Sequence, residues 1–340
     1  MKSVLIGMSG GVDSTLAALR LREDGYSVYG VVLRMHDHTE VEEAEEAANA
    51  LGIPLSVVDC SARFRDCVIA DFLKEYQKGR TPNPCIVCNE TVKFRALYEE
   101  ARRLEIPYIA TGHYAKVAAV NGRYAVCRAA DSRKDQSYML YRLSQDVLSA
   151  LLLPLGDSIK TEIMDEARRL RLTVAERAES QELCFVKGES YADYIERIYG
   201  EAPEGDFVDE EGRVLGRHKG VVHYTVGQRK GLGISAAGRL FVKEINVREN
   251  KIVLSDSKVL KRELLLTSPV FSGIAPEDLE KEEDLYVKLR YTATPVKASA
   301  HFAEEGIVVT MEEDAPFVTP GQSAVFYRGD RIAFGGVVER

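Results

Sequence analysis

The sequence of 340 residues is long enough for two or three domains, each with a core of its own. An apolar content of 45% and a charged content of 29% are ordinary for a globular protein. The net charge of −8 counts against nucleic-acid binding over the whole surface, but not against local basic patches. No apolar run approaches the roughly 18 residues of a membrane span, and the N-terminus lacks the regions of a signal peptide. We therefore expect a cytoplasmic protein without membrane association.

The first predicted element is a buried strand over Ser3–Ile6, followed by a glycine-rich turn, Gly7–Gly11, and a helix that opens at Asp13 and Ser14. A strand that ends in small residues at a helix N-terminus offers backbone N–H groups and the positive end of a helix dipole to an anion. The turn has neither the lysine of a Walker A loop nor the glycine spacing of a dinucleotide-binding fingerprint. The pattern predicts a phosphate site of another kind; the alternative is an ordinary strand-to-helix turn.

Strands and helices alternate over the following hundred residues. We expect strands over Tyr26–Met35, Ile53–Asp59 and Ile106–Tyr114, and helices over Glu40–Leu51, Phe64–Gln77 and Val92–Leu104. This alternation predicts an α/β fold with a doubly wound parallel sheet. Ligands bind such sheets at the carboxyl ends of the strands, where Gly112 and His113 would join the glycine-rich turn.

The segment Gly79–Asn89 carries two prolines and the pair Cys85 and Cys88, and we expect an irregular loop there. The six cysteines include no second Cys-x-x-Cys, and no histidine pair completes a structural zinc site. Two interpretations stay open: incidental thiols, or a functional cysteine site completed by a distant residue, for which Cys184 is the best candidate. The other cysteines are expected in the core: Cys60, Cys67 and Cys127.

The chain changes character after the α/β pattern. A hairpin is expected over Val120–Arg128, turning at Asn121 and Gly122, before a polar loop over Lys134–Ser137. From about residue 201 glycines are frequent and the β-type runs are short, and from about residue 264 short strands with turn signals suggest a small β-barrel. We predict an α/β domain over 1–200, a small mixed or β central domain over 201–260, and a C-terminal β-barrel over 261–340.

Basic residues are concentrated in the predicted central domain. Gly212–Lys243 contains seven lysines and arginines and no acidic residue, although the chain as a whole is acidic. A solvated basic face is the ordinary explanation, whereas contacts with phosphates explain the absence of acids better. The run therefore favours a nucleic-acid partner.

Seven motifs occur in the order that is typical of one enzyme family. They are GMSGGVDS (7–14), TPNPCIVCN (81–89), ATGHYA (110–115), KDQSYML (134–140), ESQELCFV (179–186), YTVGQRKGLG (224–233) and LRYTATP (289–295). With these motifs the chain resembles the MnmA-type tRNA-specific 2-thiouridylases, which belong to the PP-loop ATP pyrophosphatases. The resemblance implies that ATP with Mg²⁺ adenylates C2 of the wobble uridine in tRNAs for Lys, Glu and Gln. Sulfur transfer would then give 2-thiouridine, AMP and pyrophosphate.

The resemblance also implies roles for individual residues. Those that would hold ATP are Gly7, Met8, Ser9, Gly10, Gly11, Val12, Asp13, Ser14, Leu33 and Gly112. Those that would contact the target base or the rest of the tRNA are Asn83, Pro84, Cys85, His113, Lys134, Asp135, Gln136, Arg290, Tyr291 and Gln322. Cys184 would carry a persulfide, and Cys88 would act as the nucleophile that releases its sulfur and closes a disulfide.

One residue departs from the family pattern, because Cys85 replaces the usual aspartate of the Pro-Asn-Pro-Asp-x-x-Cys-Asn loop. Three thiolates, Cys85, Cys88 and Cys184, would then be able to hold a 4Fe–4S cluster with one iron open to hydrosulfide. From the sequence we place this cluster ahead of the persulfide relay. Either route needs an upstream sulfur donor, a cysteine desulfurase or a sulfur carrier protein.

Two other classes of function are also compatible with the sequence. A small-molecule ligase of the amidating or argininosuccinate type would share the Ser-Gly-Gly-x-Asp-Ser loop and the formation of AMP, but would have no use for the three cysteines. A non-catalytic RNA-binding protein would need only the basic patches.

Overall fold

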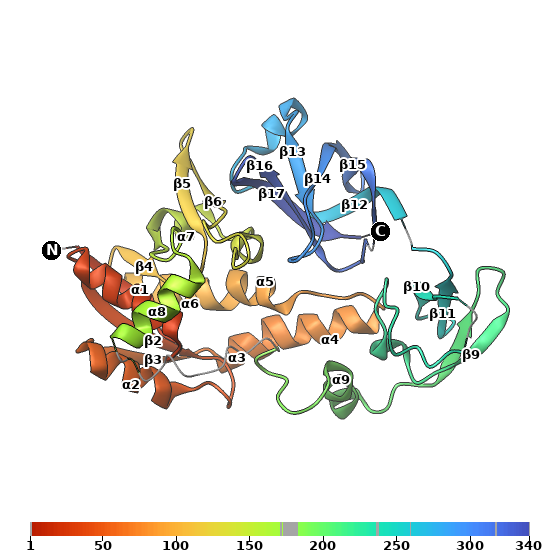
Figure 1. Ribbon diagram of the computed structural model, residues 1–340, viewed down its shortest axis with the longest axis horizontal. Helices are drawn as coiled ribbons and strands as arrows, with labels where there is room; N and C mark the ends of the chain where they lie inside the picture. The colour runs from red at the N-terminus through yellow and green to blue at the C-terminus, as the bar shows by residue number, and fades with distance from the viewer. Residues whose placement is uncertain are drawn as a thin grey trace.

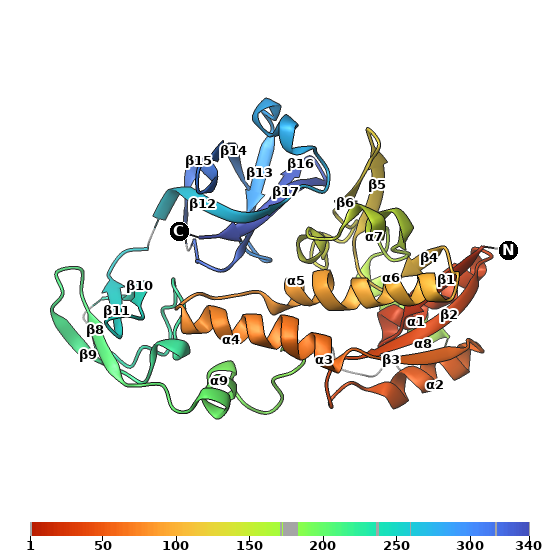
Figure 2. The same cartoon turned by 180° about the vertical axis from the view of Figure 1, so that it is seen from behind.

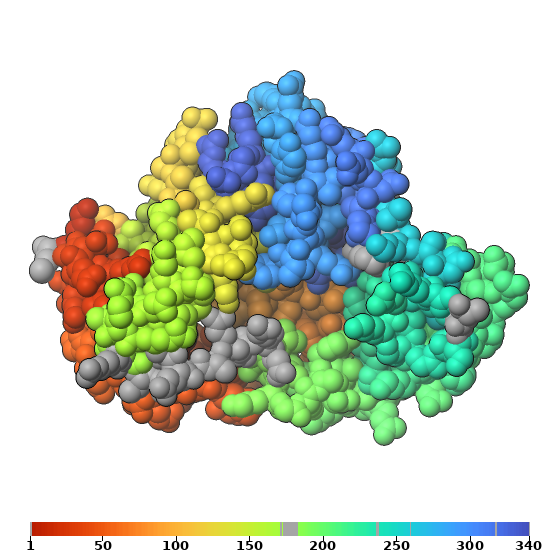
Figure 3. All heavy atoms as spheres, viewed as in Figure 1, coloured from red at the N-terminus to blue at the C-terminus, as the bar shows by residue number. Residues whose placement is uncertain are grey.

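The structure is a computed structural model that describes residues 2–170, 172, 183–235, 238–258, 260–316 and 318–339. The chain forms three lobes: an α/β lobe at the N-terminus, a small sheet in the middle of the sequence, and a C-terminal β-barrel (Figure 1). The barrel lies above the helices that run from the α/β lobe toward the small sheet, and the view from behind shows the same arrangement (Figure 2). In the space-filling view the three lobes pack into one body (Figure 3).

The α/β lobe is built on a five-stranded parallel sheet in the order β3-β2-β1-β4-β7. Its strands are β1 (Ser3–Gly7), β2 (Ser27–Arg34), β3 (Leu55–Asp59), β4 (Tyr108–Ala110) and β7 (Leu151–Leu152). Alternate residues of β1 and β2 enter different cores, since Val4 and Ile6 pack in one cluster and Leu5 in another. Both faces of the sheet are therefore covered, and the prediction of a doubly wound α/β fold is confirmed.

Helices from the two ends of the lobe's sequence share one face of the sheet. That core is formed with α1 (Val12–Glu23), α2 (Val41–Leu51) and α8 (Lys160–Arg169). The opposite core is formed with α3 (Ser61–Phe64), the π-helix η1 (Arg65–Ile69), α4 (Ala70–Gln77), α5 (Pro84–Cys88), the π-helix η2 (Asn89–Lys93), α6 (Phe94–Arg103) and α7 (Gln145–Ala150).

The strand order reverses between β1 and β4. The chain leaves β1 toward β2 and β3 on one side and returns to β4 on the other side of β1. The loops that follow β1 and β4 therefore separate at the carboxyl edge of the sheet, where open α/β sheets bind their ligands. This geometry places the glycine-rich turn and Gly112 at one site.

The segment Gly79–Asn89 differs from the expected irregular loop, because its second half is the helix α5. Asn83 is the N-cap and its side chain accepts a hydrogen bond from the Ile86 N–H, while Pro84 occupies the first turn. Proline is well suited to that position, since the missing N–H has no partner inside the helix. The proline that suggested a loop thus marks a helix start.

The predicted hairpin is confirmed. Strands β5 (Lys116–Val120) and β6 (Arg123–Cys127) pair antiparallel around Asn121 and Gly122, whose φ angles are 50° and 76°. Two positive φ angles in a two-residue turn are the geometry that an Asn-Gly pair favours. The 3₁₀ helix η3 (Ser137–Leu140) follows in the next connection.

The central lobe is a mixed four-stranded sheet in the order β10-β11-β8-β9. Its strands are β8 (Gly205–Val208), β9 (Val214–His218), β10 (Phe241–Asn246) and β11 (Lys251–Ser255), of which β11 and β8 are parallel. Helix α9 (Tyr191–Tyr199) packs on the 3₁₀ helix η5 (Val221–His223), where His223 Nε2 lies 2.9 Å from Glu196 Oε1.

The C-terminal lobe is a closed antiparallel barrel of six strands, as predicted. They are β12 (Leu260–Val270), β13 (Leu285–Lys288), β14 (Val296–Ala303), β15 (Gly306–Pro316), β16 (Ser323–Arg328) and β17 (Arg331–Val338), with the 3₁₀ helix η6 (Pro276–Lys281) between β12 and β13. The barrel closes because β12 pairs with both β15 and β17. A pair between Arg331 and Cys127 joins it to the hairpin of the α/β lobe.

Within the described residues no helix has the length and apolarity to cross a membrane. The domain bounds 1–200, 201–260 and 261–340 stay a prediction from the sequence.

Candidate active site

The turn after β1 is a preorganised backbone cradle. Gly10 has a φ of 73°, and a Cβ added to it would lie 2.6 Å from Glu43 Cβ, so a side chain at this position would collide with α2. The Ser9 N–H donates to Ser14 Oγ at 3.3 Å, and Ser14 Oγ donates to the Gly11 carbonyl at 3.0 Å. Among the described residues no side chain caps α1 at Gly11, so its first amides remain available to an anion.

Gly112 lies directly against this cradle. A Cβ on Gly112 would be 2.7 Å from the carbonyl carbon of Asp13 and from the Ser14 nitrogen. Leu33, near the end of the neighbouring strand β2, is buried in the core beneath the same edge. The structure thus brings together the Gly7–Ser14 turn and Gly112, which the resemblance assigned to ATP.

Two residues that sequence reasoning missed complete this region. Lys160 Nζ, at the start of α8, lies 2.8 Å from both carboxylate oxygens of Asp13. Tyr114 Oη donates to Asp13 Oδ1 at 2.7 Å. Lys160 is 147 residues from Asp13 and belongs to no motif, so nothing in the single sequence signals the pair.

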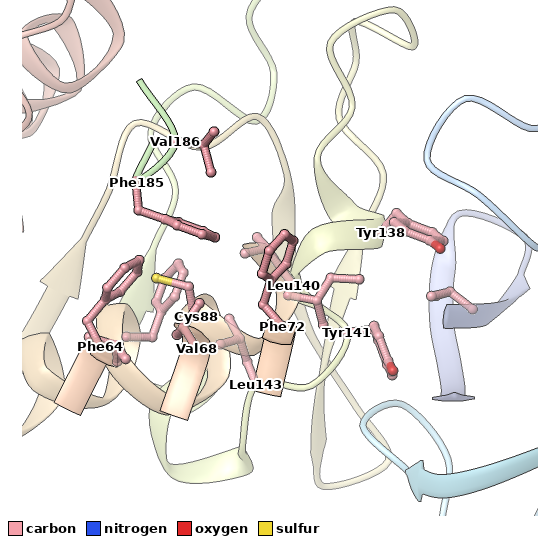
Figure 4. Close-up of a cluster of buried hydrophobic side chains, with 14 of the residues drawn as sticks. Phe64, Val68, Phe72, Cys88, Tyr138, Leu140, Tyr141, Leu143, Phe185 and Val186 are labelled. Atoms are coloured by element: carbon pink, nitrogen blue, oxygen red, sulfur yellow. The ribbon is translucent and has the colours of Figure 1, made fainter. Parts of the chain in front are cut away.

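Cys85 and Cys88 lie three residues apart on α5 and therefore project from the same side of that helix. Cys88 is 7% exposed, and its Sγ is 3.5 Å from Met35 Sδ, whereas Cys85 and Cys184 are exposed. Cys88 lies among Phe64, Val68, Phe72 and Phe185 (Figure 4).

The three thiols influence one another's ionisation. The pKa of Cys88 is raised to about 11, chiefly by burial and to a smaller extent by Cys184 and Cys85, while Lys93 acts in the opposite direction. The pKa values of Cys85 and Cys184 are also raised, chiefly because the protein around these thiols keeps part of the water away, and Lys93 again opposes both shifts. Cys184 therefore lies within electrostatic reach of the α5 pair, as the prediction of a composite cysteine site requires. Residues 179–182 of its motif lie outside the described part.

All six cysteines are free thiols in this structure. As expected, Cys60 and Cys127 are buried, while Cys67 is half-buried. Among the described residues, which include Cys85, Cys88 and Cys184, no group of three or more Cys, His, Asp or Glu side chains is arranged to hold a metal ion. The arrangement of these side chains therefore gives no support to the 4Fe–4S cluster that the sequence favoured.

Comparison with known proteins places the chain in a family. Family models described as tRNA methyl transferase HUP domain, tRNA methyl transferase PRC-barrel domain and aminomethyltransferase beta-barrel domain match residues 2–188, 192–256 and 261–338. A tRNA-specific 2-thiouridylase MnmA from Clostridioides difficile (strain 630) is 41% identical over 357 residues, covering 100% of this chain and 98% of the relative. The chain belongs to the MnmA family. A second MnmA from Clostridium acetobutylicum is 40% identical over 355 residues, with 99% of each chain covered.

His113 is the first of the residues whose contact with tRNA the MnmA family implies. It follows β4, and burial lowers its pKa to about 3, so the imidazole is neutral near pH 7. Its Nδ1 is 2.9 Å from Thr111 Oγ1, and its ring packs 5.5 Å from that of Phe94. The side chain lies at the same sheet edge as Gly112, as the sequence predicted.

The polar loop of the MnmA motif KDQSYML is bonded within the protein. Asp135 is buried, and its Oδ1 accepts hydrogen bonds from the Ala129 and Ser137 N–H groups. Gln136 Oε1 accepts from the Tyr114 N–H at 2.8 Å, and Lys134 is half-buried. These bonds fix the loop, and the burial of Asp135 gives no support to the implied contact with tRNA.

One of the three barrel residues in the MnmA pattern contacts the cysteine segment. Gln322 Nε2 donates to the Thr81 carbonyl at 2.7 Å, just before Asn83 and Pro84. Arg290 donates to Thr319 Oγ1, and the Tyr291 ring lies 6.4 Å from that of Tyr138. The barrel thus fixes the segment that precedes α5.

Several basic side chains of the run over Gly212–Lys243 are paired with acidic residues that lie outside the run. Arg213 pairs with Asp209 at 2.6 Å, and Arg217 pairs with Asp206 at 2.9 Å. Lys243 also pairs with Glu210. The acids come from β8 and the turn just before the run, so the fold supplies charges that lie outside the Gly212–Lys243 window.

Proposed function

We propose that the protein is an ATP-dependent tRNA-uridine 2-sulfurtransferase that converts the wobble uridine of tRNAs for Lys, Glu and Gln to 2-thiouridine. The proposal is supported by the PP-loop cradle at the carboxyl edge of the sheet and by Cys88, whose Sγ lies 3.5 Å from Met35 Sδ just after β2, in a chain of the MnmA family. A ligase for a small metabolite uses the cradle but has no role for the thiols.

Adenylation is the first step that these residues serve. The uridine O2 attacks the α-phosphorus of ATP, which enters with Mg²⁺, and pyrophosphate leaves. The backbone of the Gly7–Ser14 turn and the uncapped start of α1 would hold the phosphates. The step turns a poor leaving group into AMP. The target base has to leave its stack to reach Asn83 and Pro84 beside the thiols.

Sulfur transfer is the second step, and we assign it to a persulfide relay. The terminal sulfur of a Cys184 persulfide attacks C2, and AMP leaves with its electron pair. The Cys88 thiolate then attacks Cys184 Sγ and breaks the sulfur–sulfur bond, whose electron pair stays on the sulfur at C2. This leaves 2-thiouridine and a Cys88–Cys184 disulfide, which an external thiol reduces with two electrons. A cysteine desulfurase or sulfur carrier protein in the cytoplasm would supply the persulfide sulfur.

The relay and the cluster make different demands on Cys85. The relay needs Cys88 and Cys184, whereas a 4Fe–4S cluster needs all three thiols. Anaerobic purification with iron and sulfide analysis separates the two, and we expect iron-free protein to thiolate tRNA. Iron-dependent activity that is lost in Cys85→Ala together with the cluster absorbance would overturn the relay.

AMP formation from ATP tests the general assignment against the ligase. We expect unmodified tRNA to stimulate AMP formation by the purified protein, and expect no stimulation by amino acids or other small metabolites. Stimulation by a metabolite and not by tRNA would favour the small-molecule ligase, and absence of ATP binding would favour a non-catalytic RNA-binding protein.

A further inference from the structure

Lys160 lies on α8, which carries none of the sequence motifs, and its side chain contacts Asp13 beside the phosphate-binding cradle. Its side chain is 11% exposed, and its ammonium group lies 2.8 Å from each carboxylate oxygen of Asp13. Tyr114 donates to the same carboxylate at 2.7 Å, and its ring centroid is 5.7 Å from Lys160 Nζ. A buried lysine that pairs with both oxygens of one carboxylate is held in a single position.

The backbone of Lys160 is fixed as firmly as its side chain. Lys160 is the first residue of α8, and its N–H donates to Asp131 Oδ2 at 3.1 Å. Asp131 is itself buried and also accepts from the Arg133 N–H. The start of α8 is thus tied to the loop after β6, which leaves the lysine little freedom to move away from Asp13.

The ion pair is not needed simply to attach α8 to α1. Arg20 of α1 pairs with Glu166 of α8 at 3.0 Å, and Ile163 and Ala167 of α8 are buried against the same core. The Arg20–Glu166 ion pair and the buried apolar residues therefore hold the two helices together without Lys160. The pair between Lys160 and Asp13 lies at the other end of α1, next to the cradle.

The negative charge of a nucleotide would explain why a lysine–aspartate pair lies at the start of α1. A triphosphate held at the uncapped start of α1 would lie close to the carboxylate of Asp13, the second residue of that helix, and like charges repel. A lysine that neutralises the carboxylate reduces this repulsion.

We propose that Lys160 is a positioning residue of the nucleotide site, which neutralises Asp13 and orients its carboxylate so that a triphosphate binds beside it. The inference rests on the proposed function, because that function supplies ATP as the ligand.

The test compares binding of ATP and of adenosine by calorimetry, in EDTA so that no metal contacts Asp13. We expect Lys160→Met to weaken ATP binding at least about tenfold, since the Asp13 carboxylate would keep an uncompensated negative charge beside the phosphates. Adenosine, which has no phosphates, should bind Lys160→Met as it binds the unmodified protein. Glu166→Gln is the matched control, because it breaks an α1–α8 ion pair away from the cradle, and it should bind both ligands normally.

Asp13→Asn gives a test of opposite sign that does not depend on the folding of Lys160→Met. With the carboxylate neutral, the lysine charge is uncompensated, so ATP should bind at least as tightly as to the unmodified protein. The double variant Asp13→Asn with Lys160→Met should bind ATP more tightly than Lys160→Met alone.

Three results would overturn the inference: normal ATP binding by Lys160→Met, equal loss of ATP and adenosine binding, or a double variant no better than Lys160→Met. Failure of the unmodified protein to bind ATP at all would instead overturn the proposed function, and the inference with it.

Discussion

Ionisation of Cys88 is the residue-scale property on which sulfur transfer depends. Burial raises its pKa to about 11 from an ordinary value of 9.0, so the thiol is protonated at neutral pH in the free protein. Thiolates, not thiols, attack sulfur. A raised pKa therefore lowers the reactivity of the Cys88 thiol at neutral pH.

Alkylation of Cys88 should therefore increase with pH through the whole range from 7 to 10, because a raised pKa shifts ionisation toward higher pH. Lys93→Met should slow alkylation at every pH in this range, since Lys93 favours the thiolate. Lys93→Arg, which keeps the charge, is the control. The measurement is iodoacetamide labelling of Cys88 followed by mass spectrometry, and a rate that levels off below pH 9 would contradict the raised pKa.

Serine at either relay position separates adenylation from sulfur transfer. We expect Cys88→Ser and Cys184→Ser each to abolish 2-thiouridine while tRNA-stimulated AMP formation continues, because neither thiol contacts the phosphates. Cys67→Ser, which changes a half-buried thiol outside the site, should retain both activities. Thiolation by Cys184→Ser with an enzymatic sulfur donor would exclude the persulfide relay.

At the scale of the element, α5 determines where two of the three thiols point. Its N-cap is Asn83, and the family pattern also assigns Asn83 to the target base. Asn83→Ala should lower the free energy of unfolding by about 1 kcal/mol through loss of the cap. Asn83→Asp keeps a capping oxygen, so it should unfold like the unmodified protein in urea but lose affinity for tRNA. If Asn83→Asp binds and thiolates tRNA normally, Asn83 acts through the cap alone.

The sequence predicted those elements whose conformation is determined by a few neighbouring residues. The Gly7–Ser14 turn, the alternating strands and the Asn121-Gly122 hairpin were all predicted because glycine, apolar runs and Asn-Gly pairs act locally. Helix α5 was missed because the prolines of its segment were interpreted as loop residues. Proline is in fact favoured in the first turn of a helix, and Pro84 occupies that position after the N-cap Asn83. Lys160 was missed because its partner lies far away in the sequence, and no short-range rule reports such a pair.

At the scale of the whole molecule, the barrel is joined to the cysteine segment by Gln322, which donates to the carbonyls of Thr81 and Pro82. The Thr81 N–H also donates to the Pro320 carbonyl at 2.9 Å. A lobe that is distant in sequence thus holds the segment that leads directly into α5.

Gln322→Glu should loosen this connection, because a carboxylate facing two carbonyls has no proton to donate. We expect faster hydrogen exchange over residues 79–88 and slower tRNA thiolation. His301→Ala, at an exposed position on the barrel, should change neither. Unchanged exchange in Gln322→Glu would show that the barrel does not control the segment.

Transfer of the uridine oxygen tests the central claim most directly, because adenylation and sulfur insertion meet at that atom. The purified protein would be given ATP with Mg²⁺, a cysteine desulfurase with cysteine, a reductant, and tRNA labelled with ¹⁸O at O2 of the wobble uridine. We expect one 2-thiouridine per AMP, with the label in the phosphate of AMP. Thiolation without label in AMP, or AMP without 2-thiouridine, would contradict it.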